Sequence, residues 1–99
     1  MTNTKITLPK INLNGTSPET LYDEYNWAAI FVRKTMQSIT AATFHGRDFQ
    51  GNHPDDFNQA QFERAEILAK LDDALDYCMA WMENANEAIE SREIGRAHV

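Results

Sequence analysis

The segment from residue 44 to residue 53 is the part of this chain richest in side chains that could bind a ligand. It contains His45, Arg47 and Asp48, followed by Phe49. Arg47 could bind a carboxylate or phosphate through two parallel N–H donors, and Phe49 could stack on a planar group. Alternatively, Arg47 pairs with Asp48 or with a helix end, and the two phenylalanines of the segment fill space beneath a structural loop. His45, Arg47, Asp48 and Phe49 are therefore candidate ligand-binding residues, with both interpretations open.

A second group of basic residues lies outside this segment. Arg33 and Lys34 belong to an earlier apolar stretch, and Arg64 and Lys70 to a later one. If copies of the chain associate, these residues could meet across an interface and form a cationic pocket for a nucleotide-sized anion. Ion pairs with neighbouring acidic residues explain them equally well. Arg33 and Lys34 join the candidate ligand-binding residues on this basis.

No group of residues meets the requirements of a catalytic or metal site. His45, Asp48, His53 and Asp55 offer nitrogen and oxygen ligands, but they lack any recognised metal-ligand spacing. The carboxylates between residues 72 and 76 have the pattern of a solvated helix face. We therefore expect no enzyme activity, no bound metal and no cofactor.

Charge and composition exclude several classes of partner. The net charge is −6, with most acidic residues after Asp55, which disfavours binding to long nucleic acids. The longest uncharged apolar run, from Trp27 to Val32, is far shorter than the roughly 20 residues of a membrane span. The single cysteine, Cys78, lies in an apolar pattern and is expected to be a buried structural thiol. Without a recognisable signal peptide, a cytoplasmic location is expected.

Two helix-forming stretches follow an arm. Residues 1–16 are predicted to be an extended arm or edge strand, with the turn dipeptide Asn14-Gly15 redirecting the chain into a helix. Thr16, Pro18 and Glu19 indicate a helix start with a capping box. We predict a helical hairpin over residues 17–92. Its parts are a helix from about 17 to 43, a loop from 44 to 53 and a helix from about 54 to 91.

Each predicted helix carries more apolar surface than one neighbouring helix covers. One stripe on each helix suits an antiparallel partner, which predicts an all-α fold, a long antiparallel two-helix hairpin. A second strip remains on both, so we predict that the chain forms a homo-oligomeric bundle. The second helix should also extend past the first, leaving Trp81 and Met82 exposed unless the arm or another copy covers them. The predicted self-association residues are Trp27, Ile30, Phe31, Tyr77 and Trp81.

The last seven residues, 93–99, are predicted to be non-native. Their sequence, Glu-Ile-Gly-Arg-Ala-His-Val, is the translation of GAG ATC GGA AGA GCA CAC GTC. That string matches a DNA adapter widely used in sequencing libraries. No function is therefore assigned to His98.

Two motifs together resemble small uncharacterised proteins of tailed bacteriophages and prophages. The first is Ile11-Asn12-Leu13-Asn14-Gly15-Thr16-Ser17, and the second is His45-Gly46-Arg47-Asp48-Phe49. The resemblance implies a phage accessory protein in the cytoplasm of an infected bacterium, with host or phage proteins as partners. In size and build the chain is also similar to phage anti-defence hairpins that sequester nucleotide signals, an analogy at the level of fold alone. The expected function is that of a non-enzymatic, self-associating interaction protein. The alternative is a sponge for a small anionic nucleotide.

Overall fold

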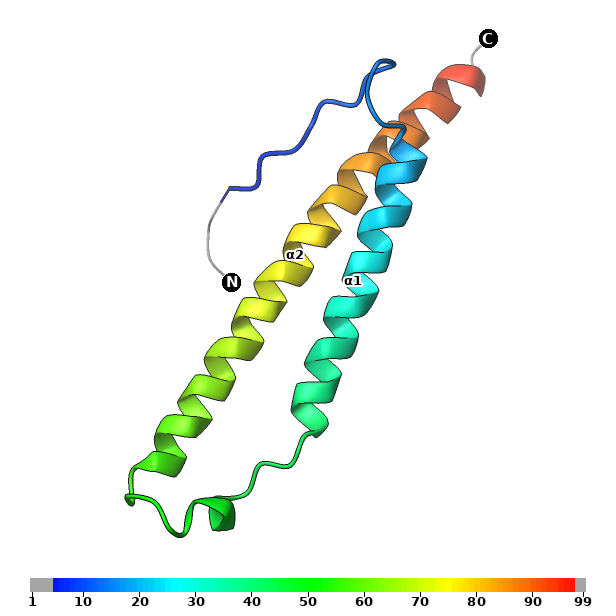
Figure 1. Cartoon of the computed structure of the whole chain (residues 1–99). Helices are drawn as coiled ribbons and strands as arrows, with labels where there is room; N and C mark the ends of the chain where they lie inside the picture. The colour runs from blue at the N-terminus through cyan, green and yellow to red at the C-terminus, as the bar shows by residue number, and fades with distance from the viewer. Residues whose placement is uncertain (1–4, 98–99) are drawn as a thin grey trace.

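The protein is an all-helical antiparallel hairpin, as the apolar patterns predict. A computed structural model describes residues 5–97, with side chains described for residues 5–92. Within residues 5–97 the elements are helix α1 (Pro18–Ala41), the short 3₁₀ helix η1 (Gly46–Phe49) and helix α2 (Asp56–Ala97), with no strand. Figure 1 shows α1 and α2 side by side, joined at one end by the segment containing η1. The chain is elongated, measuring 71 × 24 × 21 Å.

Helix α1 begins one residue later than predicted and with a different cap. Ser17 is the N-cap residue, and its hydroxyl oxygen accepts a hydrogen bond from the backbone N–H of Thr20 at 3.2 Å. Pro18 occupies the first turn, where its missing N–H has no helical partner to lose. The predicted capping box from Thr16 to Glu19 is wrong, because Ser17 and not Thr16 caps the helix. The residue three positions after this cap is Thr20, whose hydroxyl oxygen accepts a hydrogen bond from the Ser17 hydroxyl.

The connection between the helices is longer than the predicted loop. Helix α1 ends at Ala41, with Ala42 in extended conformation, and α2 begins at Asp56. The intervening residues contain the helix η1, whereas residues 44–53 were predicted to be a loop without a helix. The turn before α2 is closed by the N–H of Asp56, which donates to the carbonyl of His53 at 3.0 Å. Pro54 therefore precedes the helix and does not lie in its first turn.

The buried core is small and lies toward the end of the hairpin where α1 begins. The buried hydrophobic residues are Ala29 on α1 and Cys78, Met82 and Ala85 on α2. Ala29 and Ala85 are completely inaccessible to solvent, so the helices lie close together where their side chains are smallest. The rest of the predicted stripes is only partly covered, including Leu21, Val32, Met36 and Ile39 on α1 and Leu68, Leu71 and Leu75 on α2.

The arm packs against α2 without forming a strand. Figure 1 shows it running alongside α2 toward the start of α1. The side-chain amide of Asn84 donates to the carbonyl oxygen of Pro9 at 2.9 Å. Trp81 shares a hollow with arm residues 9–12, and Met82 is buried between the helices. The arm and α1 together thus supply the cover that Trp81 and Met82 were predicted to need.

Two predicted terminal segments lie partly outside the described residues. The arm is described only from Lys5, and the tail only as backbone to Ala97. Within that range α2 continues without interruption through residues 93–97. The prediction that residues 93–99 are non-native concerns their origin, which the helical backbone of residues 93–97 leaves open.

Candidate interaction surfaces

The phenylalanines of the connecting segment have a structural role. Phe44, Phe49 and Phe57 form a cluster in which the ring centroids are 5.4 to 6.2 Å apart. Such spacings and tilted geometries are typical of favourable aromatic packing. Phe49 is thereby committed to holding η1 against the start of α2. Its role as a stacking platform for a ligand would require the cluster to open.

The polar candidates of the same segment face solvent. His45, Arg47 and Asp48 are all exposed. Among the side chains that the structure describes, none of the three forms an ion pair or a side-chain hydrogen bond, so the considered pairing of Arg47 with Asp48 is absent. The guanidinium of Arg47 is thus free to meet an external anion. The hollow where the arm turns into α1, the one beside Trp81 and the one between Tyr22 and Met82 are lined by other residues.

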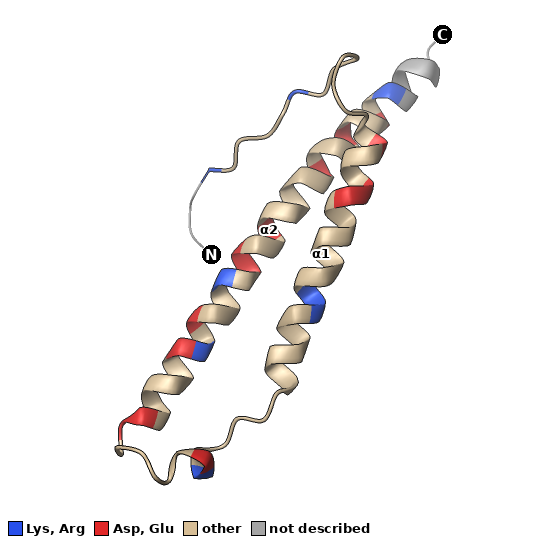
Figure 2. Cartoon of the chain, in the orientation of Figure 1, with Lys and Arg blue, Asp and Glu red and all other residues tan. Residues whose placement is uncertain are grey.

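The other basic candidates lie elsewhere on the molecule. Arg33 donates to the Sδ atom of Met79 at 3.3 Å, and the Nζ atom of Lys34 lies 6.0 Å from the centroid of the Phe31 ring. Figure 2 shows a basic patch on α1 that is separate from the basic part of η1 at the closed end of the hairpin. A single copy of the chain therefore does not bring Arg33, Lys34 and Arg47 into one site.

Arg64 has a structural function that the sequence did not indicate. Its guanidinium donates to the carbonyl oxygens of Ile39 at 3.2 Å and Thr40 at 3.0 Å, in the last turn of α1. The same group lies 5.1 Å from the centroid of the Phe44 ring. A cation at this position donates to carbonyls of the last turn and interacts favourably with the helix dipole. Arg64 is therefore engaged in capping α1.

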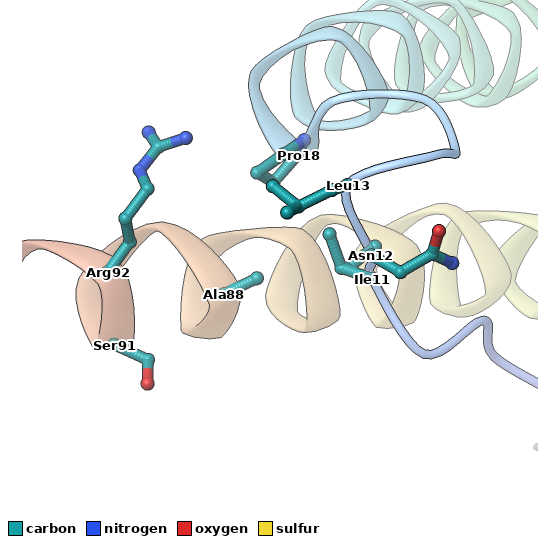
Figure 3. A pocket seen from close by; sticks show the side chains of 7 residues that line it. All are labelled: Ile11, Asn12, Leu13, Pro18, Ala88, Ser91 and Arg92. Carbon is teal, nitrogen blue, oxygen red and sulfur yellow. The ribbon is translucent and has the colours of Figure 1, made fainter.

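A hollow of about 420 Å³ lies where the arm turns into α1. Figure 3 shows Leu13 beside Pro18 on one side of it, with Ala88 and Arg92 on α2. Arg92 forms an ion pair with Glu19 across the helix pair. Sequence reasoning missed this hollow as a surface, although the Asn14-Gly15 turn and Pro18 mark the corner that creates it. Its lining is mainly apolar, and Arg92 already has an acidic partner.

The five predicted self-association residues divide into two groups. Trp27, Phe31 and Tyr77 are 60%, 59% and 44% exposed, respectively. Ile30 and Trp81 are half-buried. Trp81 stacks on Tyr25 with ring centroids 4.6 Å apart, so it mainly contributes to packing within the chain. Further large apolar side chains are exposed on α2, namely Phe62, Ile67 and Met79.

Cys78 is buried, as predicted, and the pKa of its thiol is raised by burial. The pKa of Tyr25 is also raised, first by burial and then by the neighbouring Tyr77. Burial favours the neutral form of both groups, which disfavours the reactive thiolate of Cys78. These groups behave as core residues of the hairpin.

A metal-binding group and a membrane-spanning helix are both absent from the described residues. Among the described residues there is no group of three or more His, Cys, Asp or Glu side chains that could hold a metal ion. Within residues 5–97, neither helix has a stretch that is both long and apolar enough to cross a bilayer. Comparisons of the chain with protein-family models, with curated proteins and with solved structures found no match.

Proposed function

We propose that this chain is a non-enzymatic, self-associating interaction protein, acting as a phage accessory factor in the cytoplasm of an infected bacterium. The observation that carries the proposal is the imbalance between core and exposed apolar surface. Only Ala29, Cys78, Met82 and Ala85 are buried hydrophobic residues in the described part of the chain. Two of these four are alanines, whose burial removes little surface from water.

The exposed aromatic residues make association favourable. Complete burial of one large apolar side chain contributes about 1.5 to 3 kcal/mol. Trp27 and Phe31 each retain more than half of their exposure, and they stack on one another with ring centroids 6.1 Å apart. A contiguous exposed aromatic pair is typical of a protein interaction site. An association that buries Trp27 and Phe31 in both copies gains this burial free energy for each of the side chains covered.

Sedimentation velocity over a concentration series tests the proposal. We expect the mass of the untagged protein to rise from monomer to oligomer over the micromolar range, and its helical circular dichroism signal to become more heat-resistant over the same range. A single monomeric species at several hundred micromolar would overturn the proposal.

The alternative function is a sponge that binds a small anionic nucleotide. It is supported by the exposed guanidinium of Arg47, which has no partner among the described side chains. Calorimetric titration with a panel of cyclic and linear nucleotides is the test, with Arg47→Ala as the variant and Lys5→Ala, an exposed basic residue of the arm, as the control. Binding by the control but not by Arg47→Ala supports the sponge, whereas no binding to the unmodified protein excludes it for that panel.

A further inference from the structure

We infer that two copies of this chain associate antiparallel through the outer face of α1, with Trp27 and Phe31 at the centre and Lys34 of each copy beside Glu24 of the other. The inference rests on the proposed self-association and specifies its surface, symmetry and orientation. The occupant of the face is a second copy because the order of aromatic and charged residues along the face is complementary to itself in an antiparallel pair.

The outer face of α1 is defined by its relation to the core. Ala29 is fully buried and points toward α2. Trp27 lies two residues before Ala29 and Phe31 two residues after it. Since each residue of an α-helix turns by about 100°, both aromatic side chains point about 160° away from Ala29, on the side opposite α2. α2 cannot cover them, and their exposures of 60% and 59% agree with this geometry.

Opposite charges flank the aromatic pair symmetrically. Glu24 lies three residues before Trp27, and Lys34 three residues after Phe31. Both are exposed, and helical spacing of three places each on the same face as its aromatic neighbour. Asp23, beside Glu24, strengthens the acidic side. Lys34 already lies 6.0 Å from the Phe31 ring, at the edge of the patch. Along the helix, this face therefore carries an acidic residue, two aromatic residues and a basic residue, in that order.

A two-fold axis through the middle of this face brings complementary groups together. In an antiparallel pair centred level with Ala29, Trp27 of one copy meets Phe31 of the other. In the same arrangement Lys34 lies level with Glu24, and the symmetry repeats this ion pair on the other side. A parallel arrangement would instead place Lys34 against Lys34 and Glu24 against Glu24. Charge pairing thus selects the antiparallel orientation.

The exposed apolar residues of α2 are a poorer self-association surface. Phe62, Ile67 and Tyr77 lie on a helix whose acidic side chains greatly outnumber its basic ones. Two such faces placed together would bring like charges into proximity, which opposes association. α1 has the only exposed aromatic stack found among the described residues, and it carries both signs of charge.

Charge reversal tests the ion pairs. Lys34→Glu and Glu24→Lys should each raise the dissociation constant of the dimer about tenfold or more, because each creates two like-charge pairs per dimer. An equimolar mixture of the two variants should recover association close to that of the unmodified protein, since every pair in the mixed dimer is again of opposite charge. Lys70→Glu and Glu87→Lys, exposed on α2, are matched controls and should leave association unchanged.

Electron spin resonance tests the orientation. A spin label at Ser38, introduced as Ser38→Cys in a Cys78→Ala background, should report a separation of about 27 Å along the helix axes in the antiparallel dimer. A parallel dimer would give about 10 Å.

The outcomes separate this inference from the proposed function. An unmodified protein that remains monomeric overturns both. An oligomer whose association is unaffected by either reversal, or whose mixed variants fail to recover, overturns the α1 interface while self-association stands. Both variants alter exposed positions, and circular dichroism at low concentration verifies that they fold.

Discussion

The two halves of the hairpin differ in how completely they are packed. The arm-covered half combines residues 18–29 of α1 with residues 78–92 of α2, and it contains every fully buried side chain among the described residues. The loop-proximal half combines residues 30–41 with residues 56–77, and none of its described side chains is fully buried. In both halves, apolar residues recur at spacings of three and four along each helix. Stripe pattern alone therefore does not determine burial.

The difference arises from a third layer. In the arm-covered half, Trp81 stacks on Tyr25 and shares a hollow with the arm, so three segments enclose the core. In the loop-proximal half, the connecting segment packs only near the start of α2, through Phe44 and Phe49, and Ile67 and Tyr77 remain 46% and 44% exposed. A pair of helices leaves two lateral grooves open, and closing one of them requires another piece of chain.

The largest expected effect comes from truncating the aromatic residue of the covered groove. Trp81→Ala removes the stack on Tyr25 and the contact with the arm, and should lower the free energy of unfolding by about 2 to 3 kcal/mol. The matched variant Phe62→Ala, at a position that is 61% exposed, should change it by less than about 0.5 kcal/mol. Urea unfolding followed by circular dichroism, at one low protein concentration, measures both. Equal losses in the two variants would contradict the difference between the halves.

The helical periods were sufficient to predict the fold but not the location of the core. Spacings of three and four predict two long helices and their facing stripes, and the structure confirms both. The same spacings do not distinguish Ala29 and Ala85, which are fully buried, from Ile39 and Leu68, which are partly covered. Nor do they show that the arm lies beside Trp81 and Asn84, because an irregular segment has no period from which its path can be predicted.

A second expected effect concerns the end of α1 in the loop-proximal half. Arg64→Ala removes two hydrogen bonds to the carbonyls of Ile39 and Thr40 and should cost about 1 to 2 kcal/mol. Hydrogen exchange should accelerate at the amides of residues 39–42, because the last turn of α1 loses its cap. Amides near Met82 should keep their protection until the whole hairpin unfolds.

Arg64→Lys separates charge from geometry in this cap. An ammonium keeps the charge near the helix end but lacks the planar fork that bonds two carbonyls at once. We expect exchange rates between those of the unmodified protein and Arg64→Ala. Equal acceleration near Met82 and at residues 39–42 would show that the two halves unfold as one unit, and would remove the basis for treating them separately.

The candidate site shows a similar limit of sequence reasoning. The residue types from His45 to Phe49 favoured both a ligand loop and a structural loop, and the three phenylalanines now assign Phe49 to structure. The third member, Phe57, belongs to the next helix, so only the fold brings it to Phe44 and Phe49. For Arg64 the decisive partners are backbone carbonyls 24 and 25 residues away, which no side-chain pattern marks.

The smallest expected effect is a local one at the arm. Asn84→Ala removes the hydrogen bond to the carbonyl of Pro9. This loss should lower the free energy needed to detach the arm from α2 by about 1 kcal/mol. If the arm opens and closes faster than it is cleaved, trypsin cleavage after Lys10 should become about fivefold faster, because cleavage then follows the population of the open arm. Asn86→Ala is the matched control, since the amide of Asn86 donates to Glu90 at 2.9 Å and has no contact with the arm.

The outcome of that experiment also determines how independent the arm-covered half is. If the arm is a separately opening layer, its release should leave the free energy of global unfolding nearly unchanged, while Trp81 gains exposure to solvent quenchers of its fluorescence. If release of the arm instead destabilises α1 and α2 as much as Trp81→Ala does, the arm is part of the hairpin's cooperative core. The covered half would then owe its burial to residues 5–12 as much as to the helices, since Ala29 and Ala85 provide close helix contact but little apolar surface of their own.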